Sequence, residues 1–499
     1  MKTRLLLLGI VFLVQLPAQS RLLPSWSSGG GAGDTLAVAE EVCSDSSSLW
    51  AFAPLQAHKI VYFGSSVPYG QGATQKVGYT SLYTQILQER SRQGKGLNWQ
   101  TVNICVPGDN TIKVLNRWKS DLLPQKAKYV VYALALGNEG IHEFGQPRFD
   151  QFKTNLQRLI QQARDSGMVP VVTNSYTRND YTAADYAFIQ QMNLLIHSWD
   201  VPSINLLGAI DNGAGRWTDG YWDDALHPND AGHREMAYTL VPSLFDALAA
   251  NKPLPKKVPG SFITLASTAQ ESLALSFTPE NVVHSFTNTV SFKSAKAATL
   301  VQLKDAGEGM GTISTDKKGK ILYQSAKGGQ VLGTTKVKDG KWHKVTLTHY
   351  YARGETILYL DSVRVGTLAE KLVPTQVILG GRDKKQKKLF RNWSFHRSGM
   401  TQEEVYRLVA DSVLKSSLEL YAPLDGDLVS VSDSLVNLAQ STNTLQVIHP
   451  SPGNKHLRAD VKRQYPPFVG EVRFWPRSRW RKSYDRVSSK SFSDQVQSI

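Results

Sequence analysis

A serine, a histidine and an aspartate are placed so that they could act as a nucleophile and its base. Ser66 lies in the glycine-rich run 64–70, directly after the strand-like segment 59–63. A serine hydroxyl is a poor nucleophile at neutral pH and needs a base within hydrogen-bonding reach. His227 can be that base, and Asp224, in the same loop, can hold the second ring nitrogen.

Each of these signals has a structural alternative. A serine in a glycine-rich run is most often only a turn residue. Asp224 and His227 would by themselves more often be a structural pair or half of a metal site. We find no third ligand at a useful spacing and no His-Glu-x-x-His motif, so the sequence predicts no metal site and no organic cofactor.

Attack of an activated serine on a carbonyl group also needs hydrogen-bond donors for the oxyanion that develops on the carbonyl oxygen. Gly108 follows the second expected strand and offers an unobstructed backbone N–H, and Asn138 follows the third and offers a side-chain amide. Glycine and asparagine fill many turns, so each signal is weak alone. Ser66, Gly108 and Asn138 nevertheless follow successive strands, which predicts that they share one edge of a parallel sheet.

Expected strands and helices alternate between residues 58 and 250. Alternation of this kind produces a parallel sheet covered by helices on both faces, with functional residues where the strands end. The run 128–136 is apolar throughout, as in a strand that is buried on both faces. The expected strands are 59–63, 100–105, 128–136, 169–173 and 203–207, and the expected helices are 79–92, 111–123, 149–166, 183–199 and 229–249.

Residues 58–250 resemble the SGNH hydrolases, the GDSL-type esterase family, whose four sequence blocks appear in order. The blocks are Gly64-Ser65-Ser66, Gly108, Asn138 and Asp224-Ala225-Leu226-His227. The resemblance implies a flavodoxin-like three-layer α/β fold, a serine nucleophile at Ser66 and a His227–Asp224 base. It also implies oxyanion donors from the Ser66 N–H, Gly108 and Asn138.

The sequence departs from the family pattern at two positions and lacks the motif of a rival fold. Ser65 stands where the family usually has aspartate, and Glu139 follows Asn138 in a block that usually reads Gly-x-Asn-Asp. The Gly-x-Ser-x-Gly elbow of α/β-hydrolases is absent at Ser66, which argues against that fold.

A linker at 251–259, rich in proline and lysine, separates two kinds of pattern. Short alternating strands with turn signals dominate residues 260–425, as in a β-sandwich. This region resembles the concanavalin-like jelly roll of laminin-G and pentraxin-type domains, through Asp-Gly-Lys-Trp-His at 339–343, which we expect to begin an edge strand, and Leu-Tyr-Leu-Asp at 358–361. The sandwich supplies none of the four blocks, so we expect a separable accessory domain. We find no clear element in 426–499.

Residues 1–20 have the pattern of a signal peptide, with basic residues before an apolar run and small residues at its end. The run is short for a membrane anchor, the alternative, and no later stretch could cross a bilayer. We therefore expect a soluble chain that is secreted or periplasmic, with a partly flexible segment at 21–57. Cys43 and Cys105 could form a disulfide in an oxidising compartment or remain two buried thiols.

The formal net charge of the 499-residue chain is +15. No zinc-finger cysteines, RNP-type motif or basic helical stripe accompanies this charge, so we do not expect nucleic acid binding. An anionic glycan or an anionic membrane surface would fit equally well. Basic residues surround Trp475 and Trp480 in what is either a solvated tail or a contact for an anionic polymer: Arg473, Arg477, Arg479, Arg481, Lys482 and Arg486.

These observations predict a serine esterase, and the two-domain resemblance implies a carbohydrate O-acetylesterase that acts on an acetylated poly- or oligosaccharide. The alternatives are a lipase, lysophospholipase or thioesterase of the same fold, and a glycan-binding or adhesion protein whose hydrolase domain is inactive. Trp217, Tyr221 and Trp222 precede the Asp224–His227 loop and would either line a sugar subsite or pack in the core.

Overall fold

The computed structural model describes two large regions of the chain and several shorter stretches. The predicted signal peptide, Cys43 and the basic residues around Trp475 and Trp480 lie outside the described residues. The described ranges are 54–258, 262–266, 274–307, 309–381, 383, 387–410, 412–424, 428–429, 434–448 and 460–461.

A five-stranded sheet, parallel throughout, forms the centre of the first region, with strand order β2-β1-β3-β4-β5. This order is that of flavodoxin-like folds, whose ligands bind beyond the carboxyl ends of the strands. The predicted α/β class is therefore confirmed. The strands are β1 (Gln56–Gly64), β2 (Gln100–Asn103), β3 (Ala127–Ala133), β4 (Val169–Thr173) and β5 (Ser203–Ile204).

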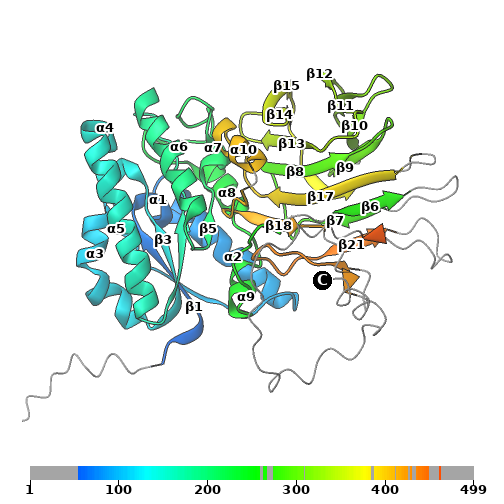
Figure 1. Ribbon diagram of the computed structural model, residues 1–499. Coiled ribbons are helices and arrows are strands. Elements are labelled where there is room, and N and C mark those ends of the chain that lie inside the picture. The colour runs from blue at the N-terminus through cyan, green and yellow to red at the C-terminus, as the bar shows by residue number, and fades with distance from the viewer. Residues whose placement is uncertain are drawn as a thin grey trace, which may run out of the picture. The chain divides into compact units, whose positions relative to one another are not determined.

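Helices cover both faces of this sheet (Figure 1). Alternate residues of a strand belong to the apolar clusters on opposite faces. Ile60 and Tyr62 of β1 face one apolar cluster, whereas Val61 and Phe63 face the other. The first layer contains α2 (Tyr79–Arg92), α8 (Asp230–Tyr238) and α9 (Leu244–Ala249), and the second contains α3 (Thr111–Asn116), α5 (Gln146–Asp165) and α6 (Ala183–Ser198).

Several of the expected elements of this region differ in the structure, three of them in kind or continuity. The predicted helix 229–249 is two helices, α8 and α9, because Pro242 lies between them and cannot continue a helix. The predicted helix 111–123 ends at Asn116 and continues as the π-helical turn η3 (Trp118–Leu122). The predicted strand 203–207 stops at Ile204, and the short helix α7 (Leu207–Ile210) follows.

Two antiparallel sheets form the second region and enclose one apolar core (Figure 1). Their strand orders are β12-β11-β10-β9-β16-β7-β21 and β15-β14-β13-β8-β17-β6-β22, with β18 paired to β17. The predicted all-β sandwich is therefore confirmed. Strands of the first sheet are β7 (Ala274–Phe277), β9 (Thr299–Asp305), β10 (Met310–Thr315), β11 (Lys320–Gln324), β12 (Gln330–Lys336), β16 (Pro374–Leu379) and β21 (Leu445–Ile448).

The second sheet contains the strand that the sequence placed at an edge. This strand, β13, pairs on both sides, with β8 and β14, so the predicted edge position is wrong. The strands are β6 (Ile263–Ala266), β8 (Phe286–Lys293), β13 (His343–Tyr350), β14 (Glu355–Leu360), β15 (Val363–Ala369), β17 (Lys387–His396), β18 (Leu418–Ala422) and β22 (Asp460–Val461). A further pair, β19 (Leu428–Val429) and β20 (Ser434–Leu435), follows β18.

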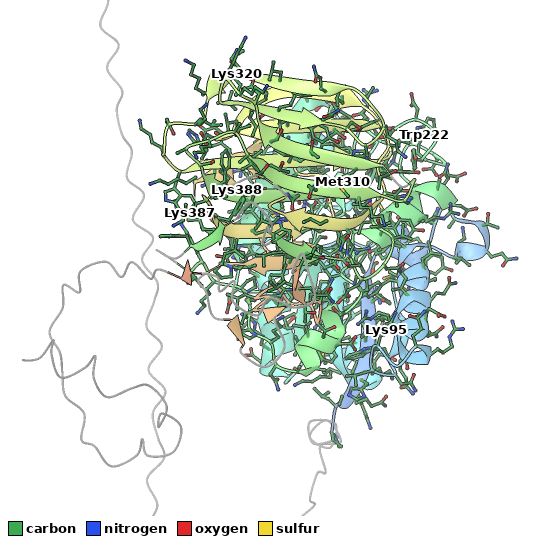
Figure 2. The ribbon with its side chains drawn as sticks, turned by 90° about the vertical axis from the view of Figure 1, so that its right-hand side faces the viewer. Lys95, Trp222, Met310, Lys320, Lys387 and Lys388 are labelled. Atoms are coloured by element: carbon green, nitrogen blue, oxygen red, sulfur yellow. The ribbon has the colours of Figure 1, made fainter. Side chains whose placement is uncertain are left out.

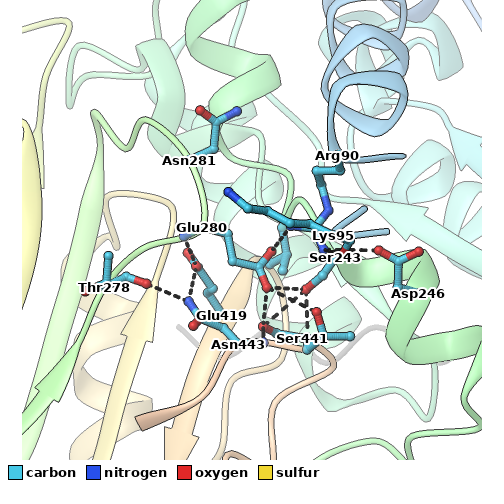
Figure 3. A network of polar contacts seen from close by, with 12 residues as sticks. Arg90, Lys95, Ser243, Asp246, Thr278, Glu280, Asn281, Glu419, Ser441 and Asn443 are labelled. Carbon is cyan, nitrogen blue, oxygen red and sulfur yellow. Dashed lines mark hydrogen bonds and ion pairs between the residues drawn. The ribbon is translucent and has the colours of Figure 1, made fainter. Parts of the chain in front are cut away.

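The described residues of the two regions belong to one compact unit, and buried polar contacts connect them. Arg90 of α2 forms ion pairs with Asp246 at 3.2 Å and with Glu280 of the sandwich at 3.3 Å (Figure 3). Ser243 donates a hydrogen bond to Glu280 at 2.6 Å. Burial, together with the nearby Glu419 carboxylate, raises the pKa of Glu280. We call this set of contacts the Arg90–Glu280 network.

A second contact buries a whole ion pair at the same interface. The Arg397 guanidinium lies 2.8 Å from the Glu419 carboxylate, and both side chains are 0% exposed. Arg397 also donates to the backbone carbonyls of Tyr238, at the end of α8, and Val282. The sandwich thereby binds the end of helix α8, which follows the Asp224–His227 loop.

The turn between β13 and β14 enters the apolar core of the α/β region. Ala352, in this turn, belongs to the same buried cluster as Ile210 and Trp217, which lie upstream of His227. The next residue, Arg353, places its guanidinium 3.5 Å from the centre of the Tyr350 ring. The α/β core is therefore completed by a residue of the sandwich.

No helix among the described residues is long and apolar enough to cross a membrane.

Candidate active site

Strand β1 delivers Ser66 to the carboxyl edge of the sheet. Its last residue, Gly64, runs so close to β3 that a Cβ would lie 1.9 Å from the Ala133 carbonyl oxygen, which explains the glycine. Ser66 then begins the one-turn helix α1 (Ser66–Tyr69). The first N–H of a helix has no acceptor within the helix, so the Ser66 N–H is available to a ligand.

The three predicted residues Ser66, His227 and Asp224 are brought together. His227 Nε2 lies 3.0 Å from Ser66 Oγ, and His227 Nδ1 lies 2.9 Å from each carboxylate oxygen of Asp224. Ser66 is 8% and His227 7% exposed. Burial opposes ionisation of Asp224, but its hydrogen bonds with His227 and the Leu226 N–H prevail and lower its pKa. An ionised carboxylate therefore holds the imidazole.

The loop that carries Asp224 and His227 is closed on itself. The Leu226 N–H donates to Asp224 Oδ1 at 2.7 Å, and the Asp223 N–H donates to the His227 carbonyl at 2.9 Å. Asn229 then caps helix α8, its side chain accepting from the Gly232 N–H. These contacts hold His227 in place just before helix α8.

Helix α8 also holds the segment that follows the nucleophile. Asp230 accepts hydrogen bonds from the Thr74 N–H and hydroxyl, both at 2.7 Å. His233 Nδ1 accepts from the Tyr79 N–H, so its Nε2 carries the proton donated to the Gln71 carbonyl at 2.9 Å. Burial lowers the pKa of His233 to about 4, which keeps this ring neutral. Ser66 and His227 are therefore tied to one scaffold.

Gly108 and Asn138 lie beside Ser66, as the sequence predicts. Gly108 has a φ of +78°, a conformation that glycine adopts without strain. Glu139, one of the departures from the family pattern, is 3% exposed and accepts from the Thr111 N–H at 3.0 Å and from its hydroxyl. Glu139 thereby joins the loop of Asn138 to the helix that follows Gly108.

A cavity of about 170 Å³ opens beside Ser66. Gln71, Tyr176 and Arg178 line it together with the predicted site residues, although none was predicted from the sequence. They occupy the segments after β1 and β4, so their position after a strand is the one signal that could have identified them. The remaining lining residues are Val67, Pro107, Gly108, Ala135, Gly137, Asn138, Leu226 and His227.

The three aromatic residues before the Asp224–His227 loop lie outside the lining of this cavity. Trp217 is 2% exposed and stacks on Tyr176, which does line the cavity, with ring centroids 5.7 Å apart. Tyr221 is half-buried, and its hydroxyl accepts from Lys371 of the sandwich at 3.4 Å. Trp222 is 38% exposed and lies at the surface of the molecule (Figure 2).

The structure shows neither the predicted disulfide nor a metal site among the described residues. Cys105 is a free, buried thiol whose pKa burial raises, and Cys43 lies outside the described residues, so the predicted disulfide stays a prediction. Within the described ranges, no group of three or more histidine, cysteine, aspartate or glutamate side chains is arranged to hold a metal ion.

The flavodoxin-like sheet, with Ser66, Gly108 and Asn138 beyond the ends of its strands, has the arrangement expected of an SGNH-type hydrolase domain. Residues 62–235 match the family model described as GDSL-like Lipase/Acylhydrolase family. The chain therefore carries a domain of this family, and the predicted SGNH-type hydrolase is confirmed.

Solved structures are similar to parts of the chain, whereas no curated protein matches it. A catalytic mutant of an acetylxylan esterase from Geobacillus stearothermophilus is 14% identical, with a TM-score of 0.31, over 37% of this chain and 92% of the esterase. A heptameric SAP-like pentraxin from Limulus polyphemus is 8% identical, with a TM-score of 0.27, over 39% of this chain and 96% of the pentraxin. At these values the similarities carry no argument about activity.

Proposed function

We propose that the protein is a serine esterase that removes short acyl groups, with a preference for acetyl, from a hydroxyl-rich carbohydrate. The observation that carries this proposal is the hydrogen-bonded chain Ser66–His227–Asp224 beside a cavity of about 170 Å³. A nucleophile, a base and a group that orients the base are then present in the arrangement that acyl transfer requires.

In the acylation step, Ser66 Oγ adds to the ester carbonyl carbon while its proton passes to His227 Nε2. The negative charge on the carbonyl oxygen is stabilised by hydrogen bonds from the Ser66 and Gly108 N–H groups and from Asn138 Nδ2. The bond to the alcohol oxygen then breaks, and His227 returns the proton to that oxygen. The products are the free alcohol and an acyl group on Ser66.

In the deacylation step, water attacks the acyl carbon and transfers a proton to His227 Nε2. The bond to Ser66 Oγ breaks, the serine regains the proton from His227, and the carboxylic acid leaves. Asp224 remains ionised throughout, because its function is to stabilise the imidazolium and to fix the ring orientation. Both steps use the same oxyanion donors.

The size and polarity of the cavity support a short acyl group and a polar alcohol. Pockets that enclose drug-sized ligands measure about 300–1,000 Å³, so about 170 Å³ favours acetyl over the long chain of a lipase or lysophospholipase substrate. Gln71, Asn138 and Arg178 bring hydrogen-bonding groups to the wall, which suits sugar hydroxyls. The signal-like residues 1–20 support export, and the sandwich supports a polymeric substrate, whose anionic character the net charge of +15 would favour.

The test compares acetate release from acetylated xylan and pectin with the hydrolysis of nitrophenyl esters of increasing chain length. We expect acetate release, together with rates that fall steeply from acetyl to long acyl esters. Ser66→Ala is the control for background hydrolysis. Long acyl esters as the best substrates would favour the lipase alternative, and an inactive wild-type protein that binds glycans would favour the adhesion alternative.

A further inference from the structure

The Asn138 amide has a partner on each side. Its Nδ2 donates to the Asp109 backbone carbonyl at 3.0 Å, and its Oδ1 accepts from Arg178 Nη1 at 3.4 Å. An amide nitrogen carries two hydrogens. One is committed to Asp109, so the other is left for a ligand in the cavity that Asn138 lines.

The chemistry of the two partners permits only one orientation of this amide. A guanidinium has five N–H donors and no acceptor, whereas a backbone carbonyl can only accept. The atom facing Arg178 must therefore be the amide oxygen, and the atom facing Asp109 must be the nitrogen. In the reverse orientation the amide N–H groups would face the guanidinium N–H groups, and the amide oxygen would face the Asp109 carbonyl oxygen.

Arg178 is itself held in place by three further contacts. Its Nε and Nη2 donate to the two carboxylate oxygens of Asp180, at 3.0 and 2.5 Å. Its guanidinium carbon lies 5.5 Å from the centre of the Tyr181 ring. It also packs on Gly137, where a Cβ would lie 2.4 Å from Arg178 Nη1. The side chain is only 13% exposed.

We propose that Arg178 is a positioning residue that fixes the Asn138 amide with its Nδ2 toward the oxyanion. Asp180 would then hold Arg178, and Arg178 would orient the Asn138 amide, just as Asp224 orients the His227 ring. This inference rests on the proposed function, because Asn138 needs a fixed orientation only if an oxyanion forms there. Direct binding of a substrate carboxylate by Arg178 is the competing role.

The experiment is a double-mutant cycle on the full chain, with nitrophenyl acetate as a neutral substrate. Arg178→Met should lower kcat about tenfold with KM nearly unchanged, as loss of a supporting hydrogen bond does elsewhere. Arg178→Lys should recover part of kcat, because lysine can still donate to Oδ1. In an Asn138→Ala background, Arg178→Met should change kcat by less than about twofold, since the residue it positions is gone.

Arg353→Met is the matched control, because Arg353 likewise pairs with a carboxylate, Glu355, and packs on a tyrosine ring, Tyr350, without contacting Asn138. If Arg178→Met does not fold, Asp180→Asn tests the same series and should lower kcat about threefold, again only when Asn138 is present. Equal losses with and without Asn138 would overturn the proposal.

A loss confined to KM, seen with a carboxylate-bearing ester and not with nitrophenyl acetate, would assign Arg178 to anion binding and would also overturn it. Full activity of Ser66→Ala would instead end the proposed esterase function. The two failures are therefore distinguishable.

Discussion

The cavity beside Ser66 and the interface with the sandwich both concentrate polar side chains, but these side chains have different partners. Ser66, His227 and Asn138 keep hydrogen-bonding capacity toward a cavity that a ligand can enter. At the interface, Arg397 and Glu419 are 0% exposed and form hydrogen bonds with each other, with backbone groups and, for Glu419, with the Asn443 side chain. Burial raises the pKa of Glu280 there and lowers the pKa of Lys252 to about 8.

The difference shows that buried charge alone would point to the wrong place. Perturbed ionisable groups often mark active sites, but ion-pair networks that only support the fold produce the same signature. Among the described residues, a cavity at this interface lined by Ser417 and Gln440 measures only about 10 Å³, against about 170 Å³ beside Ser66. Open hydrogen-bonding capacity beside a cavity, rather than buried charge, identifies the candidate site.

The largest expected effect is a loss of activity without a loss of stability, on mutation of the residues beside the cavity. Ser66→Ala and His227→Ala should each reduce kcat by about a million-fold, because each removes a member of a unit that acts together. The melting temperature should stay close to that of the wild type, since neither change breaks an interface contact. Ester hydrolysis and circular dichroism on the same samples measure both quantities. Retained activity in either variant would remove the catalytic role proposed for the cavity.

Mutation at the interface with the sandwich should instead lower the unfolding free energy. Arg397→Met leaves Glu419 buried without its partner, and breaking a buried ion pair in this manner costs about 3–5 kcal/mol of unfolding free energy. Denaturant titration measures the loss. Arg364→Met is the control, because Arg364 is 52% exposed and its ion pair should matter little. Equal stability of the two variants would show that the interface pair contributes nothing.

The third effect tests one donor of the oxyanion. Asn138→Ala should lower kcat about a hundredfold or more and change KM little, because a donor aimed at developing charge acts mainly in the transition state. Single-ester kinetics measure kcat and KM separately. An effect on KM alone would indicate that Asn138 binds the substrate rather than the transition state.

A fourth effect concerns pH and compares the α/β region with the sandwich. Burial lowers the pKa of His349 to about 3 and those of His396 and His233 to about 4. Below pH 6.5 the unfolded chain binds protons that the native state does not, so stability falls on acidification by about 1.4 kcal/mol per pH unit for each histidine. Denaturation at several pH values measures the slope. His349→Gln should reduce it, and the exposed His58→Gln should not.

The α/β region was largely predictable because its signals are local. Helix α2 and strand β4 have the predicted bounds, since each has a continuous periodic pattern. Ser66, Gly108, Asn138 and the Asp224–His227 loop were found because each follows a strand or precedes a helix. Arg178 was missed because its role depends on the separation of two strands, which no local pattern encodes.

The sandwich was predicted less completely. The predicted strands were 273–277, 290–292, 300–303, 321–324, 343–349, 356–360 and 376–379, so β10, β12, β15, β17 and β18 escaped prediction. The residues of β12 and β15 are largely exposed, which leaves little apolar alternation to detect. Strand β21 lies beyond residue 426, where no element was expected, and only its pairing with β7 defines it. The expected separability of the sandwich stays a prediction, and the contacts of Arg90 with Glu280 and of Arg397 with the end of α8 are the interactions that a truncation would remove.

Ala352 has a consequence for how the chain reaches its native state. During synthesis, residues 58–250 emerge long before the turn at 352, which completes the cluster around Ile210 and Trp217. Contacts over such sequence separations slow folding, because the entropy of loop closure is lost before the contact compensates for it. The base loop next to Trp217 should therefore acquire its final order only after the sandwich has folded. Activity would then appear late in refolding, after most of the helical signal has returned.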